Sequence, residues 1–442
     1  MTVEPPSSSG AATTSPITEP EPLAPPTKLR GGLFHHHDFR QLFVGDTISQ
    51  FGTQLTMLAL PVLAVRVLHA DEFDMGLLGM FEFLAFLVIG LPAGAWVDRW
   101  RKQRVLVTND IVRALALASL PLAWLLDALT LVQMFAVALV IGVCTVFFDV
   151  AYQSYLPDLV EPGHIGEGNA KLQASQSVAQ IGGPALAGGA IRLIGAPLTI
   201  ALDALSFLGS AFFVRRIRHV DTPPPREDRR RLHVEIREGL SFVVKNPLLW
   251  RITACTGTSN LFSSMTGALL VLFALRELGL DEGHIGIAMG LGSVGGLLGA
   301  VLTPRINAWV GEGRTIPLTS LFWIPAGALM PLAGVVIPPM VALAASSLLI
   351  SFAVVVYNVT QVSFRQRLCP RPLLGRMNAS IRFIVWGTMP IGSLVGGLLG
   401  EALGVRPVFW IAMVGSSVAA LPVLISPLIT MRDLPQELDR LS

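Results

Sequence analysis

Residues 75–106 read MGLLGMFEFLAFLVIGLPAGAWVDRWRKQRVL. The apolar part, 75–97, holds one charged residue, Glu82, and five charged residues follow between 98 and 104. An α-helix rises about 1.5 Å per residue, so about 20 apolar residues cross the hydrocarbon core of a bilayer. The stretch therefore predicts a membrane-spanning helix that ends at a basic loop.

The same pattern recurs along the chain, of which 52% is hydrophobic and only 14% charged. An ordinary soluble domain has about 25% charged residues, so a soluble chain is excluded. Backbone polar groups must be satisfied internally in lipid, so each apolar segment should be a helix. We predict an all-α membrane protein with twelve transmembrane helices at 40–67, 75–97, 104–126, 130–156, 168–194, 197–217, 247–275, 284–309, 315–335, 338–366, 376–403 and 406–429.

The basic residues indicate an orientation. With these spans, only Arg66, Arg192, Arg276 and Arg406 of the 32 Lys and Arg lie at one side. Because positive loops stay inside, the other side should be cytoplasmic. An even number of spans places both termini there, in the cell (inner) membrane. The longest connection, 218–246, is basic, and we interpret it as a cytoplasmic linker rather than a site for nucleic acid or anionic lipid.

The two ends of the chain differ from the rest. Residues 1–30 are rich in Pro, Ser, Thr and Glu and poor in large apolar residues, which predicts a disordered cytoplasmic tail. A second short tail is expected at 431–442. Three consecutive histidines, 35–37, could suggest a metal site, but neighbouring positions on a helix point in different directions. A polar juxtamembrane segment is the better interpretation, and we expect no metal and no cofactor.

Motifs recur about 208–210 residues apart. Asp-Glu begins at Asp71 and again at Asp281, and Asn-Ala before a Gly-rich run begins at Asn169 and again at Asn378. An even number of spans restores orientation, so these are parallel repeats of a six-helix unit. Duplicated halves suit a central site reached alternately from each side. The predicted halves are 31–217 and 247–430.

The basic loop has a known counterpart. GAWVDRWRKQRVL at 94–106 resembles the cytoplasmic signature of the major facilitator superfamily, with Gly94, Asp98, Arg99, Lys102 and Leu106 at matching positions. Arg101 and Gln103 depart from it, where many members have Gly and a basic residue. The loop and FFDVAYQSYLPDLV at 147–160 are similar to the branch that includes macrolide and enterobactin exporters. The resemblance covers 38–430 and implies alternating-access transport.

The loop also has a physical interpretation. Gly94 allows close helix approach. Asp98, among Arg99, Arg101, Lys102 and Arg104, can meet the positive N-terminus of a neighbouring helix. The resemblance implies that Asp98 holds the halves together in the outward-facing state, against the start of the eleventh span. The alternative is a loop needed only for topology. We expect Asp149 to join Arg99 or Arg113 in a charge network at this cytoplasmic gate.

The fifth span carries a Gly-Pro pair and a Gly-Gly pair, which are Gly183, Pro184, Gly188 and Gly189. This arrangement is similar to the antiporter signature of the superfamily, with Ala187 in place of a Gly. Small residues permit close packing, and Pro184 bends the helix. The resemblance implies export rather than uptake, although a packing role alone would use the same residues.

Acidic residues inside spans are costly and are functional candidates. Glu82 lies sixteen residues before Asp98, in the outer part of its span, and a carboxylate at the outer interface is the alternative. Asp46 and Asp203 lie in the first and sixth spans, where each could bind protons or pair with an Arg. We predict that Glu82, Asp46 and Asp203 are proton-coupling candidates.

Polar side chains recur at helical spacing on spans that line the central path in the family. The substrate-cavity candidates are Gln50, Thr53, Thr256, Asn260, Asn358 and Gln361. Hydrogen bonding between helices is the rival interpretation of each. Few charges face this path, so an amphipathic organic cargo is favoured.

No HExxH, GxSxG or phosphate-binding loop occurs, so an enzyme is not expected. We predict a monomeric secondary exporter that exchanges protons for an amphipathic compound, such as an antibiotic, a siderophore or another secondary metabolite. Its partners are the cargo, protons and the lipid bilayer, with no nucleic acid. The alternatives are a facilitator or uptake permease of the same fold, and a membrane scaffold or sensor that transports nothing.

Overall fold

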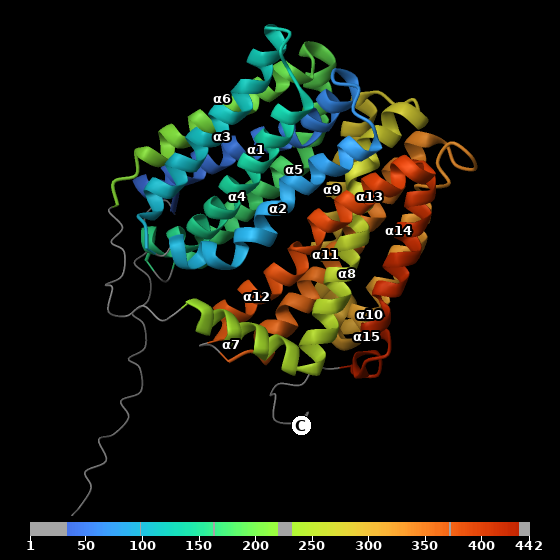
Figure 1. Ribbon diagram of the computed structural model, residues 1–442. Helices are drawn as coiled ribbons and strands as arrows, with labels where there is room; N and C mark the ends of the chain where they lie inside the picture. Colours follow the sequence, from blue (N-terminus) through green and yellow to red (C-terminus); the bar gives the residue numbers. More distant parts are fainter. Residues whose placement is uncertain (1–32, 98, 162–163, 220–231, 371–372, 433–442) are drawn as a thin grey trace, which may run out of the picture.

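The computed structural model describes residues 33–97, 99–161, 164–219, 232–370 and 373–432, which fold into helices joined by short links (Figure 1). We call α1 to α6 the first half and α8 to α15 the second half. The first half contains α1 (His37–Arg66), α2 (Glu72–Val97), α3 (Lys102–Leu125), α4 (Leu131–Leu159), α5 (Ile165–Ile194) and α6 (Ala196–Arg215). The second contains α8 (Pro247–Leu272), η4 (Phe273–Glu277), α9 (Glu282–Val310), α10 (Glu312–Ala328), α11 (Pro339–Leu368), α12 (Leu374–Trp386), α13 (Thr388–Leu403), α14 (Val405–Ala419) and α15 (Leu421–Leu424).

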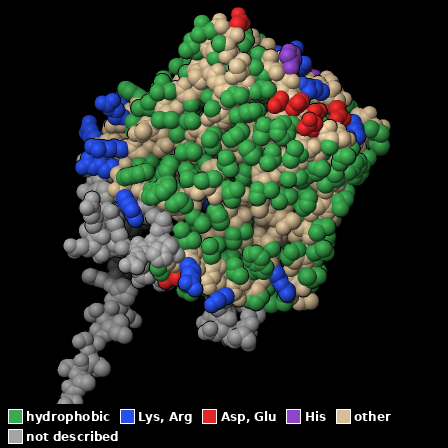
Figure 2. Space-filling view, viewed as in Figure 1, with side chains coloured by type: hydrophobic (Ala, Val, Ile, Leu, Met, Phe, Trp, Pro, Cys, Tyr) green, Lys and Arg blue, Asp and Glu red, His purple; other side chains and the backbone are tan. Residues whose placement is uncertain are grey.

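Ten helical segments of the described chain are long and apolar enough to cross a membrane. Two more complete the predicted twelve: α5, which carries many polar residues, and α10, which has 17 residues. Apolar side chains cover most of the visible surface between the two ends (Figure 2). The prediction of an all-α membrane fold is confirmed.

Proline explains where three predicted spans differ from the structure. The eleventh breaks at Gly387 into α12 and α13, because Pro390 has no N–H for the carbonyl four residues earlier. The twelfth breaks in the same way at Ala420, two residues before Pro422. The ninth ends at residue 328 instead of 335, because a residue before a proline, here Pro331, disfavours helical backbone.

The linker contains a helix that the sequence analysis missed. Residues Leu232–Lys245 form α7, which packs mainly against α12. Its Gly239 lies against the backbone of Arg376, and Glu238 forms an ion pair with the Arg376 side chain. The predicted linker therefore contributes a helix to the end of the second half (Figure 1).

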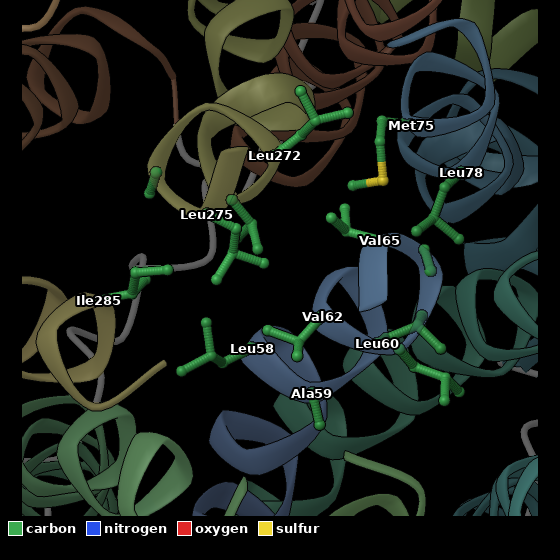
Figure 3. Packing of buried hydrophobic residues seen from close by; sticks show 14 of the residues in the cluster. Leu58, Ala59, Leu60, Val62, Val65, Met75, Leu78, Leu272, Leu275 and Ile285 are labelled. Carbon is green, nitrogen blue, oxygen red and sulfur yellow. The ribbon is translucent and has the colours of Figure 1, made fainter. Parts of the chain in front are cut away.

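Two ends of the molecule can be distinguished. The acidic end holds the links that carry Asp71 and Asp281, between α1 and α2 and between η4 and α9. The basic end holds the exposed Arg99, Arg101 and Arg104, near the junction of α2 and α3, and the last residues of α9 and α11. At the acidic end one hydrophobic cluster includes residues of both halves. Figure 3 shows Leu58 and Val62 of the first half near Leu275 and Ile285 of the second.

At the basic end the hydrophobic clusters are separate. One cluster draws its buried residues from 33–217 and another from 243–428, so neither crosses between the halves. A small fourth cluster joins them at mid-depth, where Phe86 of α2 contacts Trp386 of α12. The structure is therefore closed at the acidic end, and the cores of the halves diverge toward the basic end.

Glycines allow the closure at the acidic end. A Cβ added at Gly76 of α2 would lie 2.6 Å from Gly397 of α13. A Cβ at Gly188 of α5 would lie 2.5 Å from the carbonyl oxygen of Glu282, at the start of α9. Real Cβ atoms do not approach so closely, so helices of the two halves meet here backbone to backbone.

Gly188→Val is expected to open the acidic end, because overpacking costs about 1–3 kcal/mol. Gly189→Val is the matched control, since a Cβ there meets nothing within 4 Å. Disulfide formation between Arg66→Cys and Glu282→Cys, whose native side chains pair across the halves at 3.0 Å, measures closure. The yield should fall severalfold for Gly188→Val only. Equal yields would contradict the closed end. Both variants are made in a protein whose three native cysteines are replaced, so that only the two introduced thiols can react. These native cysteines are Cys144, Cys255 and Cys369, all buried.

Some predictions lie outside the described residues. These are the tail 1–30, Asp98, most of the basic part of the linker and residues 433–442. The division into halves at 31–217 and 247–430 stays a prediction.

Candidate functional site

The hydrogen bonds described for the basic loop lie within the first half. Gly94, expected at a close helix contact, has nothing within 4 Å of an added Cβ, so that prediction is wrong for this state. Arg99, Arg101 and Arg104 are exposed. Lys102 Nζ donates to Asp158 Oδ2 of α4 at 2.6 Å, which is a contact within the first half.

Arg113 is placed differently from the prediction. It does not lie at the gate but is buried inside the first half, with 6% of its surface exposed. Its Nη2 donates to Asp110 Oδ1 at 3.0 Å, and Ser210 Oγ of α6 donates to Asp110 Oδ2 at 2.7 Å. The guanidinium lies between the rings of Phe148 and Phe207, at 4.3 and 4.6 Å. This pair joins α3, α4 and α6.

Asp46 and Asp203 are also buried in the first half, 3% and 1% exposed. Asp46 Oδ1 accepts from Gln50 Nε2 at 3.4 Å, and the Tyr152 hydroxyl lies beside it. Asp203 Oδ1 accepts from Ser206 Oγ at 2.8 Å. Neither carboxyl group forms an ion pair within the described chain. They remain candidates for proton binding, while Gln50 contacts Asp46 rather than the cavity described below.

Glu82 lies about ten residues, or about 15 Å, from the acidic end of α2. Just before it, Phe81 stacks on Phe135 of α4, and Gly79 packs beside Ser393 of α13. On the helix, Glu82 falls between these two sides, and its side chain is exposed. It therefore faces the space between the halves, well inside the membrane, and no hydrogen bond joins it to a described residue.

Asp149 forms an ion pair that crosses between the halves. Arg382 Nη2 of α12 donates to Asp149 Oδ2 of α4 at 2.7 Å. Among the described residues the ion pair of Asp149 is with Arg382 and not with Arg99 or Arg113, although Arg113 acts on Asp149 electrostatically. The Arg382 guanidinium also stacks on Trp386 at 4.9 Å and on Phe86 of α2 at 5.6 Å. Three helices from both halves thus meet at Arg382.

The Gly-Pro motif of α5 makes contacts on two sides. A Cβ at Gly183 would lie 2.5 Å from Gln54 of α1, while Gly188 meets α9 as described. Gly189 has open space around it. Pro184 presents its carbonyl oxygen to Gly286 of α9. The motif therefore positions α5 between α1 and the second half.

A cavity of about 520 Å³ lies mainly in the second half. The first half contributes Gln54, Met57, Gln180 and Pro184, and the rest comes from α8, α9, α10, α11, α14 and Met330 in the turn after α10. The lining is rich in hydroxyl and amide groups and in methionine and aromatic side chains. Among its described lining residues none is charged. Such a cavity is large enough for a small organic molecule.

Three of the predicted cavity residues line this space: Thr256, Asn260 and Asn358. Gln50, Thr53 and Gln361 do not. Gln361 Nε2 donates to Asn358 Oδ1 at 3.3 Å from just outside. The sequence analysis missed Gln54, one residue after the predicted Thr53, because helical spacing does not fix which edge of a polar face points inward.

Trp323 and Tyr357 were also missed. Their rings meet edge to face with centroids 5.1 Å apart, and the Tyr357 hydroxyl lies 2.9 Å from Thr256 Oγ1. Trp323 Nε1 is buried and has no hydrogen-bond partner among the described residues. A Trp inside the proline-containing segment 312–328 was the only sequence signal for this position.

The comparisons with known proteins agree with this arrangement. The family model described as Major Facilitator Superfamily matches residues 42–389. The multidrug efflux pump Tap of Mycolicibacterium fortuitum is 26% identical over 375 residues, which cover 81% of this chain and 88% of that protein. Macrolide efflux protein A of Streptococcus pyogenes is 21% identical over 398 residues, which cover 87% and 94%.

Solved structures share the fold. A nucleoside transporter, NupG, matches with a TM-score of 0.68 at 14% sequence identity. The match covers 87% of this chain and 98% of the NupG chain. A bacterial homologue of the iron transporter ferroportin, in an inward-facing state, matches with a TM-score of 0.71 at 18% sequence identity. The match covers 87% of this chain and 97% of that chain. The family match over most of the chain, together with the helical membrane fold, shows that this chain belongs to the major facilitator superfamily and is a membrane transporter rather than an enzyme.

Proposed function

We propose that this transporter is an exporter that exchanges protons for an amphipathic organic compound by alternating access. Relatives named as efflux pumps and the Gly183-Pro184 motif support export. The basic end would face the cytoplasm with both termini, in the cell membrane, and the protein would act as a monomer. The cargo class would include antibiotics, siderophores and other secondary metabolites.

One observation carries the proton coupling. Asp46, Asp110 and Asp203 are buried on three helices of the first half, and Arg113 is the base buried among them. Arg113 forms its ion pair with Asp110. Asp46 and Asp203 are therefore buried without an ion pair within the described chain, and Arg113 acts on Asp203 only electrostatically. An unpaired carboxylate in such surroundings is costly, and binding a proton removes that cost. Asp46 and Asp203 would therefore take up and release protons as the halves move, with Glu82 as a third site facing the central space.

The contacts between the halves support alternating access. The closed acidic end makes this an inward-facing conformation under the proposed orientation. The Asp149–Arg382 pair would join the halves at mid-depth in this state, and we call this contact the mid-depth gate. Asp98 and Gly94 would form a second contact when the basic end closes. The outward-facing state would then require separation of the glycine contacts at the acidic end.

Charge reversal tests the gate. Asp149→Arg should reduce transport strongly, because two guanidinium groups would face each other across the halves. Restoring the pair in reverse, with Arg382→Asp added, should recover part of the transport rate. The side chains are about one-third exposed, so the coupling energy should be about 1 kcal/mol. Rates of efflux from vesicles measure both variants, and a double variant no better than Asp149→Arg would contradict the gate.

Everted membrane vesicles test the proposed direction. The test compound is one that is less toxic to cells that carry this protein than to cells without it. It should accumulate inside such vesicles when their interior is acidified. Accumulation that ignores the pH gradient would contradict proton antiport. Loss of the compound from preloaded everted vesicles would instead indicate uptake by a permease of the same fold.

A further inference from the structure

The acids and the cavity occupy different halves. All the buried acids described above belong to the first half, whereas the cavity lies mainly in the second and has no charged residue in its described lining. Glu82, the exposed acid inside the membrane, is also absent from that lining. A charged cargo in this cavity would therefore find no opposite charge to replace its hydration.

Polar groups in the wall can still recognise a cargo. Ser346, Ser347 and Ser351 line one side on α11, and Asn260 and Asn358 face the cavity from α8 and α11. Trp323 Nε1 is a donor only, and it is buried without a partner. An unmade hydrogen bond at a buried donor is costly, so a cargo that offers an acceptor to it gains affinity.

Apolar groups complete the wall. Met57, Met289, Met330 and Met413 are flexible and adapt to different shapes, and the Trp323–Tyr357 pair offers an aromatic surface. No charged side chain belongs to the described wall, so a cationic cargo would find no opposite charge in it.

We propose that the cavity in the second half binds uncharged amphipathic molecules that carry hydrogen-bond acceptors, and that a cargo with an ionisable amine binds in its neutral form. Trp323 Nε1 donates to an acceptor of the cargo. This inference rests on the proposed function only in treating the cavity as the cargo site. It assigns proton binding to the first half and cargo binding to the second.

Two probes of nearly equal shape test the charge preference. Triphenylphosphine oxide is neutral with a strong acceptor, and methyltriphenylphosphonium is a permanent cation. Equilibrium binding of each is measured on the purified full chain in lipid nanodiscs, without a pH gradient. The oxide should bind at least about tenfold more tightly, because the cavity offers a cation no partner. Equal or tighter binding of the cation would overturn the proposal, and so would the absence of saturable oxide binding.

Two variants locate the effect. Trp323→Phe keeps an aromatic ring and removes the donor, so oxide binding should weaken about three- to tenfold. Trp309→Phe, at a position that is 84% exposed on α9, is the matched control and should bind normally. Asn358→Asp places a negative charge in the cavity and should shift the preference toward the cation. An unchanged preference in Asn358→Asp, or an unaffected Trp323→Phe, would contradict the assigned cavity.

The binding measurement separates this inference from proton coupling. Equal binding of the two probes would leave proton antiport standing. A transporter that ignored a pH gradient would still be expected to prefer the neutral probe.

Discussion

Asp203→Asn should abolish efflux driven by a pH gradient while leaving cargo binding intact. Asp203 is 1% exposed, and its carboxyl group accepts from Ser206. It forms no ion pair within the described chain, and Arg113 acts on it only electrostatically. Asparagine keeps the size and the hydrogen bond but cannot change charge by binding a proton. Proton binding at this site could then no longer drive the conformational change, so the pH gradient would not power transport through it.

Vesicle efflux with an imposed gradient measures this effect, and it should fall to the leak of protein-free vesicles. Asp127→Asn is the matched control, because Asp127 is exposed in the link between α3 and α4. It should behave like the unchanged protein. Gradient-driven efflux by Asp203→Asn at the normal rate would remove Asp203 from the proton pathway and leave Asp46 and Glu82 to be tested in the same way.

The second large effect concerns stability. Asp110→Ala should lower the free energy of unfolding by about 3–5 kcal/mol, because the Arg113 guanidinium would stay buried without its carboxylate. Adding Arg113→Leu should recover much of the loss, since an apolar side chain fits between Phe148 and Phe207. Thermal unfolding of the solubilised protein compares these variants.

An exposed ion pair supplies the control for that experiment. Asp158→Ala removes the partner of Lys102 at the basic end, where Asp158 is 37% exposed. Its effect should stay within about 1 kcal/mol, because water screens such pairs. If Asp110→Ala were no more destabilising than Asp158→Ala, the buried pair would not hold α3 to its neighbours as described.

Much of the fold could be predicted from the sequence because lipid imposes a simple length rule on apolar runs. The predicted and observed ends of the first eight spans agree within a few residues. Prolines altered three of the others, and their positions were readable in advance. The helix α7 was missed because its apolar residues cover only one face, which a search for continuous apolar runs does not detect.

The site was predicted less completely, for a different reason. Arg113 lies eleven residues beyond Lys102, about 16 Å into the membrane, so helical rise alone could have moved it away from the gate. The Asp149–Arg382 pair depends on how the halves are arranged, and residues 233 positions apart carry no local signal of contact. The contact between Trp323 of α10 and Tyr357 of α11 was missed for the same reason, because it depends on how two helices pack.

The most direct test of the account is whether proton movement and cargo movement are linked in opposite directions. Purified protein is placed in proteoliposomes that contain a pH-sensitive dye, and no pH gradient is imposed. The compound added outside is one that is less toxic to cells that carry this protein. Inward movement of the compound should drive protons out, so the interior becomes more alkaline, and Asp203→Asn should show no change. Cargo movement at the full rate with no change of internal pH would contradict proton antiport.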